Sequence, residues 1–171
     1  MSIGSVAAPA APPGSLQCSL QAPARVSAGQ PVMLVFTVTN RGATPVRVLE
    51  WNTPFEGWFA PYVEVARDGI AVRYHGPVMK RGDPSADEYF ALAAGASRRA
   101  EVDLALPFDL SVPGHYLVTP HLTLFDQFAD GEKTTARPRA AHGSRALTGG
   151  PVRVEIVPAP ARRPGSAKIA G

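Results

Sequence analysis

The 171-residue sequence contains one cysteine, Cys18, so neither an intrachain disulfide nor a multi-cysteine metal site can form. No apolar run approaches the roughly eighteen residues that a membrane-spanning helix needs. The N-terminal residues also lack the basic and apolar segments of a secretory signal peptide. We therefore expect no membrane span, and no export signal is visible in the sequence.

Charge is scarce as well, with charged residues making up 18% of the chain and a formal net charge of +3. Three basic residues, Arg162, Arg163 and Lys168, lie in a C-terminal tail rich in Pro, Ala and Gly. Without them the remainder is close to neutral, whereas nucleic-acid binding needs Lys and Arg gathered on one face. The sequence therefore predicts no nucleic-acid partner.

The common catalytic motifs are missing. The sequence has no His-Glu-x-x-His, no Gly-x-Ser-x-Gly, no phosphate-binding Gly-Lys-Ser/Thr loop and no dinucleotide fingerprint. Its histidines are His75, His115, His121 and His142. We expect surface or hydrogen-bonded roles for them, because His115 and His121 would lie about 20 Å apart along one strand. Cys18 is expected to be a half-buried residue of the first strand. No enzyme, cofactor or metal site is predicted.

The residues that are abundant indicate a β protein. Hydrophobic residues make up 45% of the chain, and 18 prolines and 16 glycines favour short segments joined by tight turns. Apolar residues alternate with a period of two in the segment that contains Val32, Leu34, Phe36 and Val38. Asp68-Gly69 can supply the positive φ angles of a two-residue hairpin turn.

Similar patterns predict seven to nine short strands and no strong helix. In residues 46–51 we expect Val46 and Val48 to face away from Leu49 and Trp51. Tyr116, two residues after a turn glycine, suits the corner tyrosine of a sandwich domain. The prediction is an immunoglobulin-like antiparallel β-sandwich over residues 15–157, with a long, mobile polar loop at about 126–150. Residues 1–14 and 158–171 are predicted to be disordered.

Two segments stand out, "WNTPFEG" at 51–57 and "GPVMKRGDP" at 76–84. With their surroundings, they resemble the N-terminal, non-catalytic pro-domain of bacterial secreted zinc endopeptidases of the deuterolysin/peptidyl-Lys (aspzincin) family. The matching blocks are residues 20–57, 64–84 and 92–118, so the resemblance covers most of residues 16–125. In that family a catalytic domain follows, with His-Glu-x-x-His and a downstream Gly-Thr-x-Asp, and neither motif occurs in this sequence.

The resemblance implies a region that covers the active site, keeps the protease inactive and assists its folding. We therefore expect a stand-alone, pro-domain-like inhibitor of a secreted aspzincin zinc metalloendopeptidase, located in the periplasm or secreted, and monomeric when free. Two alternatives stay open. One is an intermolecular folding chaperone of such a protease, and the other is a non-enzymatic adhesion or binding module that shares only the sandwich.

The first candidate surface is aromatic. Trp51, Phe55, Trp58 and Phe59 fall within nine residues. They would form either an interaction hot spot or a plug at one end of the sandwich, with Trp51 the stronger candidate for core packing. Residues 52–57 can also be a structural corner, because Pro54 fixes φ and glycine permits the turn.

The second candidate surface is the loop with Met79, Lys80 and Arg81, which Pro77 and Pro84 stiffen. Proteases of the family are expected to prefer lysine just after the cut, so the resemblance implies that Lys80 enters the protease pocket. The alternative is a solvated basic turn. A carboxylate of Asp83 or Glu56 that reaches the partner's zinc is a weaker hypothesis. The predicted protein-binding residues are Phe55, Glu56, Trp58, Met79, Lys80 and Arg81.

Overall fold

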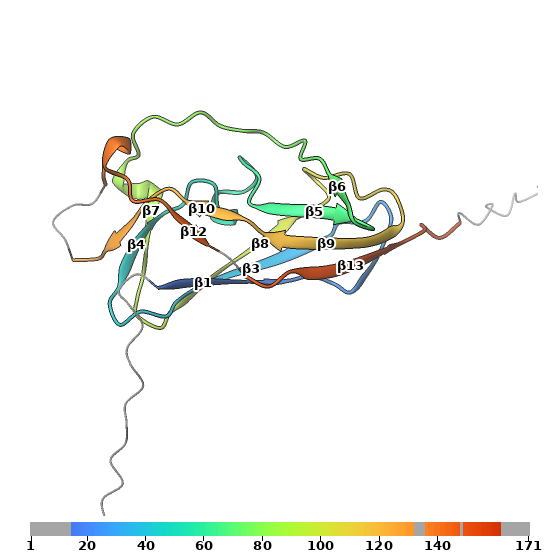
Figure 1. Ribbon diagram of the computed structural model, residues 1–171, viewed down its shortest axis with the longest axis horizontal. Coiled ribbons are helices and arrows are strands. Elements are labelled where there is room, and N and C mark those ends of the chain that lie inside the picture. The colour runs from blue at the N-terminus through green and yellow to red at the C-terminus, as the bar shows by residue number, and fades with distance from the viewer. Residues whose placement is uncertain (1–14, 132–135, 148, 162–171) are drawn as a thin grey trace, which may run out of the picture.

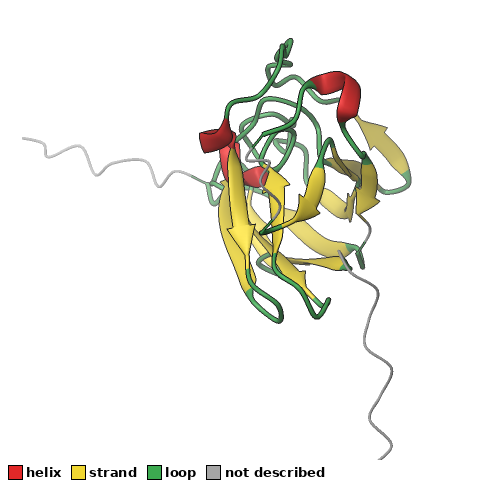
Figure 2. Cartoon of the chain, turned by 90° about the vertical axis from the view of Figure 1, so that its left-hand side faces the viewer, coloured by secondary structure: helices red, strands yellow, loops and turns green. Residues whose placement is uncertain are grey.

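The computed structural model describes residues 15–131, 136–147 and 149–161. Over these residues the chain forms thirteen short strands and three single-turn 3-10 helices, η1 (Pro54–Glu56), η2 (Ala86–Glu88) and η3 (Arg139–Ala141). Figure 2 shows that strands make up the body and that the helices are short turns among the loops. The predicted all-β class is confirmed. No helix of the described part is long and apolar enough to cross a membrane.

A five-stranded sheet has the order β2-β13-β9-β5-β6. Its strands are β2 (Arg25–Ser27), β5 (Val63–Arg67), β6 (Ile70–Val72), β9 (Gly114–Pro120) and β13 (Val152–Val157). The strand β13 pairs in parallel with β2 and antiparallel with β9. The turn between β5 and β6 is the predicted hairpin, with Asp68 at φ 46° and Gly69 at φ 84°.

A second sheet has the order β1-β3-β8, and all its pairs are antiparallel. Its strands are β1 (Leu16–Gln21), β3 (Met33–Asn40) and β8 (Ser97–Asp103). Two smaller sheets lie toward one end of the molecule (Figure 1). They contain β4 (Val46–Leu49), β7 (Tyr89–Leu92) and β11 (Gln127–Ala129), and the pair β10 (Leu122–Leu124) and β12 (Arg145–Leu147).

The core lies between the two large sheets. Leu34, Phe36 and Val38 of β3 are buried as the alternation predicted. Tyr116 and Val118 of β9 enter the same hydrophobic cluster from the other sheet. Because each sheet buries one face, the two faces close a single core. The Tyr116 hydroxyl donates to the Val112 carbonyl at 2.6 Å, which confirms the predicted corner tyrosine.

The strand count was predicted wrongly, whereas the alternation predicted for residues 46–51 is confirmed. The strands β2, β11 and β12 have three residues each, too few for a period of two to show. Leu49 faces away from Val48 as expected, and both side chains are buried. The reason is that β4 lies between two apolar clusters. Val46 and Val48 face the main core, whereas Leu49 packs in a second cluster with Trp51, Tyr89 and Phe128.

The stretch at 126–150 is also more structured than predicted. It contains β11, η3 and β12 instead of a continuous loop. Asp126, which is fully buried, accepts hydrogen bonds from the Tyr89 hydroxyl at 2.7 Å and from Arg137 Nε at 3.0 Å. These bonds tie the polar stretch to β7. The predicted disordered segment at 1–14 lies outside the described residues, as does the predicted segment at 158–171 except for residues 158–161, which are exposed and form no strand or helix. The predicted domain boundaries stay predictions.

Candidate protein-binding surface

Residues 73–85 connect β6 to η2, and we call this segment the strap. It runs the length of one side of the molecule, along the top of Figure 1. At its start the His75 amide donates to the Pro107 carbonyl at 2.7 Å, and the Tyr74 hydroxyl donates to the Pro77 carbonyl at 2.8 Å. A Cβ atom at Gly76 would lie 2.4 Å from the Tyr74 ring, so a larger residue there would have to displace that ring.

The "WNTPFEG" segment is a tight corner beneath the strap. The Thr53 hydroxyl donates to the Glu50 carbonyl at 2.6 Å and accepts from the Phe55 amide at 3.3 Å, which caps η1. Asn52 has a φ of 58°, and its backbone N–H donates to Glu56 Oε1 at 2.8 Å. Gly57, at φ 88°, ends the turn. The structural-corner alternative therefore describes this backbone.

Trp51 is only 4% exposed, as its expected core role requires. Its indole N–H donates to Glu88 Oε1 at 2.9 Å. Burial raises the pKa of Glu88, but hydrogen bonds from the Ser85 amide, the Trp51 indole and the Ser85 hydroxyl outweigh burial and lower the pKa overall. Glu88 is thereby held as an ionised acceptor behind the Trp51 ring.

An ion pair joins the corner to the strap. Arg81 Nη2 lies 2.5 Å from Glu56 Oε1, and the two side chains are 13% and 10% exposed. The Arg81 guanidinium also lies 5.0 Å from the centre of the Trp51 ring, a cation–π distance. Glu56 therefore holds both the Asn52 amide and the Arg81 side chain, so two of the predicted binding residues position each other.

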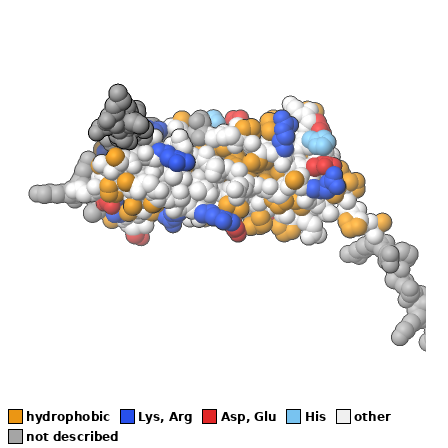
Figure 3. Space-filling view, turned by 90° about the horizontal axis from the view of Figure 1, so that it is seen from below, with side chains coloured by type: hydrophobic (Ala, Val, Ile, Leu, Met, Phe, Trp, Pro, Cys, Tyr) orange, Lys and Arg blue, Asp and Glu red, His pale blue; other side chains and the backbone are white. Residues whose placement is uncertain are grey.

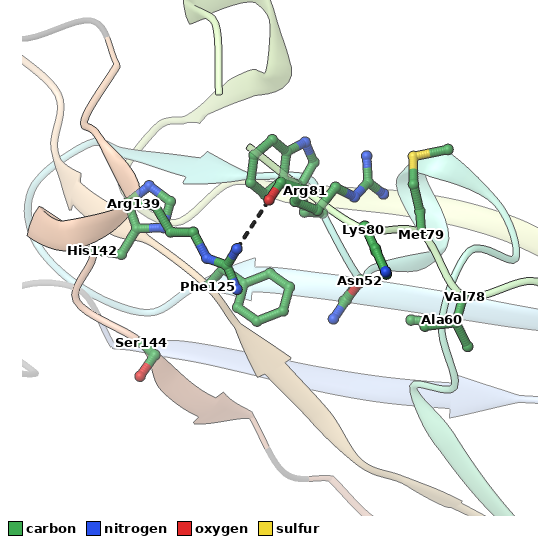
Figure 4. Close-up of a pocket in the computed structure, with 11 residues that line it drawn as sticks. Asn52, Ala60, Val78, Met79, Lys80, Arg81, Phe125, Arg139, His142 and Ser144 are labelled. Carbon is green, nitrogen blue, oxygen red and sulfur yellow. Dashed lines mark hydrogen bonds between the residues drawn. The ribbon is translucent and has the colours of Figure 1, made fainter. Parts of the chain in front are cut away.

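A pocket of about 690 Å³ opens beside the strap. Figure 4 shows side chains of the strap on one side and of the segment around η3 on the other. Its lining residues are Trp51, Asn52, Ala60, Val78, Met79, Lys80, Arg81, Phe125, Arg139, His142 and Ser144. Arg139 bridges the two sides, because its Nη1 donates to the Arg81 carbonyl at 2.9 Å and its amide donates to Asp83 Oδ1 at 2.8 Å.

The side chains at the middle of the strap face outward. Val78 is 72% exposed and Met79 is 45% exposed. Lys80 is exposed too, and within the described part of the chain its ammonium group has no hydrogen-bond or ion-pair partner. The backbone next to it is held, because the Met79 amide donates to the Phe59 carbonyl at 3.1 Å. Lys80 is thus a free cation between two fixed neighbours.

Two of the six predicted residues lie elsewhere. Phe55 packs edge-on against Phe90, with ring centres 5.0 Å apart, beneath the Arg98 guanidinium. Trp58 stacks flat on Tyr62, with ring centres 4.2 Å apart. The Trp58 indole N–H donates to the Asp103 carbonyl at 3.0 Å. Neither residue lines the pocket, whereas Met79, Lys80 and Arg81 do.

The sequence did not indicate Phe125, Arg139 or His142, because they are 45 or more positions after Lys80. The hydrogen bonds from Arg139 to the strap hold η3 beside the pocket, whereas Phe125 reaches it from the turn between β10 and β11. The His142 ring lies edge-on to Trp51 at 6.3 Å, and its Nε2 is 2.9 Å from the Arg137 carbonyl. No sequence signal could have found this arrangement, since a polar, glycine-rich stretch shows no periodicity.

The structure also places the possible metal ligands and Cys18. Among the described residues, no group of three His, Cys, Asp or Glu side chains could hold a metal ion. Cys18 is buried, and burial raises the pKa of its thiol to about 11, so it is a protonated thiol at neutral pH. Asp83 and Glu56 are the two carboxylates that were expected to be able to reach a partner's zinc. In this structure Asp83 accepts from the Arg139 amide, and Glu56 accepts from the Asn52 backbone amide and from Arg81.

The comparisons with known proteins place this β domain among protease-related sequences. The chain is 35% identical over 117 residues to a protein named "Extracellular protease" of Aeromonas hydrophila, an alignment that covers 68% of this chain and 33% of that protein. It is 31% identical over 104 residues to a "Neutral protease 2 homolog" of Uncinocarpus reesii, covering 60% of this chain and 29% of that protein.

A third relative is "Neutral protease 2 homolog MEP8" of Coccidioides posadasii, 29% identical over 84 residues, which are 48% of this chain and 24% of that protein. The chain therefore spans about a third or less of the curated relatives that it matches. No family model matches the chain. The chain thus contains a protease-related region that corresponds to part of larger proteins named proteases.

Proposed function

We propose that this chain is a non-catalytic, pro-domain-like inhibitor of a secreted zinc endopeptidase of the aspzincin family. Its strap enters the active-site cleft, and Lys80 occupies the pocket that otherwise receives a substrate lysine. The observation that carries the proposal is the exposed, unpartnered Lys80 between the anchored residues Met79 and Arg81. The relatives named as proteases supply the class of partner.

The geometry of the strap favours tight binding. A flexible loop loses conformational entropy when it is ordered in a cleft, and this loss weakens binding. Here the Phe59 carbonyl holds Met79 before binding, while Glu56 and the Trp51 ring hold Arg81. Only the exposed side chains at positions 78 to 80 then need to be ordered in the cleft.

The proposal includes an immunoglobulin-like topology for the scaffold. Three observations support it: the parallel pairing of β2 with β13, the order β13-β9-β5-β6 in one sheet, and the corner hydroxyl of Tyr116. In such folds, loops at the ends and edges of a rigid sandwich carry the binding residues. The strap is a loop of this kind.

Two observations support the non-catalytic part of the proposal. The 171 residues contain no His-Glu-x-x-His, and Cys18 is buried with a raised thiol pKa. We propose that the chain acts outside the cytoplasm, because its Aeromonas relative is named an extracellular protease. We also propose that the chain is a monomer when it is not bound to the protease. The same contact can form within one chain or between two chains.

The test is inhibition of a purified, already folded, lysine-directed aspzincin protease. We expect nanomolar inhibition by the wild-type chain and a loss of about 100-fold, or about 2.7 kcal/mol, for Lys80→Ala. Arg153→Ala removes one exposed charge from β13, away from the strap, and should inhibit like the wild type.

The other outcomes separate the alternatives. If Lys80→Ala inhibits as strongly as the wild type, the inhibitor function is supported, and the contact with the protease is assigned to Phe55 and Trp58 instead. Faster refolding of denatured protease without inhibition of the folded enzyme would favour the chaperone. Absence of binding at micromolar concentration would contradict the proposal and favour an adhesion module.

A further inference from the structure

The pocket beside the strap is cationic on its rim and aromatic in its wall. Four of its lining residues, Lys80, Arg81, Arg139 and His142, are basic, and none of the eleven is a carboxylate. The positive charge of Arg81 is compensated by Glu56. Lys80 and Arg139 therefore supply the net charge on the two sides of the opening, with the Phe125 ring between them (Figure 4), and the Trp51 ring also lines the pocket.

Carboxylates near the pocket are already engaged elsewhere. Asp83 Oδ1 accepts from the Arg139 amide at 2.8 Å, and Glu88 Oε1 accepts from the Trp51 indole on the side away from the pocket lining. Neither lines the opening, so neither ion-pairs with Lys80. Among the described residues neither Lys80 nor the Arg139 guanidinium has an ion-pair partner, so a carboxylate supplied by a partner could be the first to pair with them.

The pocket also offers neutral hydrogen-bonding groups. The hydrogen bond from the backbone N–H of Asn52 to Glu56 holds Asn52 at a positive φ. Within the described residues, the side-chain amide of Asn52 has no hydrogen-bond partner. Ser144 is exposed at the opposite side. An amide and a hydroxyl can bind the N–H and C=O groups of a peptide backbone.

The remaining wall is apolar, with Ala60, Val78 and Met79 beside the Phe125 ring. A volume of about 690 Å³ lies within the range of pockets that enclose a ligand. Nucleic acid fits poorly, because it needs a long stripe of cations to follow its phosphates. A mixed wall of apolar and cationic groups instead matches a peptide with apolar and acidic side chains.

We infer that this pocket binds an acidic peptide segment of the partner protein, with its carboxylates between Lys80 and Arg139 and its apolar side chains against Trp51 and Phe125. The identity of the partner as a protease rests on the proposed function. The inference adds a second contact next to the strap, made by residues of η3 and its flanks. It also specifies the sign of charge on the facing surface of the partner.

The experiment is a titration of the ¹⁵N-labelled chain with a blocked hexapeptide of alternating Leu and Asp, followed by NMR. The two indole N–H signals report separately, since Trp51 lines the pocket and Trp58 does not. We expect the Trp51 signal to shift and the Trp58 signal to stay. The same peptide with Asn in place of Asp is the control, and binding of the acidic peptide should weaken as salt is raised.

Variants give the sharper test. Arg139→Ala and Lys80→Ala should each weaken the acidic peptide by about fivefold, the size expected for one partly exposed ion pair. Arg153→Ala, which lowers the net charge equally, should not. Lys80→Ala serves as the second variant because removing Arg139 also removes its bond to the Arg81 carbonyl.

The inference is overturned if the Trp51 signal does not shift, if both peptides bind equally, or if all three variants bind alike. Its failure is distinct from failure of the proposed function. Protease inhibition without peptide binding would contradict the peptide-binding role of the pocket and would leave the proposed inhibitor function standing. Peptide binding that depends on Arg139, without inhibition of any protease, would support the pocket and contradict the inhibitor.

Discussion

Two arginine–carboxylate pairs in this molecule look alike and have different roles. Arg81 lies over the Trp51 ring at 5.0 Å and pairs with Glu56, and Arg137 lies over the Phe128 ring at 4.9 Å and pairs with Asp126. The carboxylate of Asp126 is fully buried and accepts from Tyr89, from both Nε and Nη2 of Arg137, and from the Gly143 amide. Glu56 accepts from two donors.

The number of donors explains the difference in role. Four donors on one buried carboxylate connect β7 to the chain around Arg137 and Gly143, so this pair is part of the scaffold. The pair of Glu56 and Arg81 connects only the corner at 51–57 to the strap. Breaking the first pair should therefore affect folding, whereas breaking the second should mainly affect the position of Lys80.

The largest expected effect is from Asp126→Asn. The substitution keeps the shape but removes the negative charge that Asp126 places against Arg137, and we expect a loss of about 3 kcal/mol in the free energy of unfolding. Urea denaturation monitored by tryptophan fluorescence measures it. Asp130→Asn, at an exposed position in the same stretch, is the matched control and should stay within about 0.5 kcal/mol of wild type. Equal stability of Asp126→Asn and Asp130→Asn would contradict a structural role for the pair of Asp126 and Arg137.

Acid should produce part of the same effect. Burial raises the pKa of Asp126, but the bonds from Arg137, Tyr89 and Gly143 and the charge of Arg137 together lower it below the ordinary value of 3.8. A lowered folded-state pKa means that the stabilisation is complete above the unfolded value and is lost as the pH falls through the folded value. The stability gap between wild type and Asp126→Asn should thus narrow below about pH 3.8. A constant gap from pH 7 to pH 2 would contradict this origin.

A smaller loss of stability is expected for Glu56→Gln. The amide can still accept from Asn52, but the charged bond to Arg81 is lost, at a cost of about 1.5 kcal/mol because both side chains are nearly buried. Protease inhibition should fall by about tenfold as the strap loosens, about 1.4 kcal/mol. Urea denaturation and inhibition assays on one preparation measure both quantities. Glu101→Gln, in an exposed pair on β8, is the control.

The smallest effect on stability is expected for Lys80→Ala, within about 0.5 kcal/mol, because Lys80 makes no polar contact with the described residues. The same variant carries the predicted loss of inhibition. A residue that changes inhibition and leaves the urea midpoint unchanged acts at the surface. A shift of the midpoint by several times that amount would show that Lys80 supports the fold instead.

Local features of the fold could be predicted from the sequence. The alternation in β3, the Asp-Gly turn and the corner role of Tyr116 each depend on residues a few positions apart. The pair of Glu56 and Arg81 depends on residues 25 positions apart, and Arg139 meets the strap from 58 positions away. Sequence periodicity does not predict contacts between residues so far apart. The sequence therefore indicated the pocket residues of the corner and the strap, but not Phe125, Arg139 or His142.

The anchors on both sides of Lys80 also determine what a cut in the strap would do. If a protease hydrolysed the bond between Met79 and Lys80, the new ends would stay where they are. The Phe59 carbonyl would keep Met79 in place, and Glu56 would keep Arg81. The fragments would not separate, and the new carboxyl and amino groups would remain within reach of each other. Under the proposed function, a nicked chain could therefore stay in the protease cleft and be resealed, so hydrolysis would not release the enzyme.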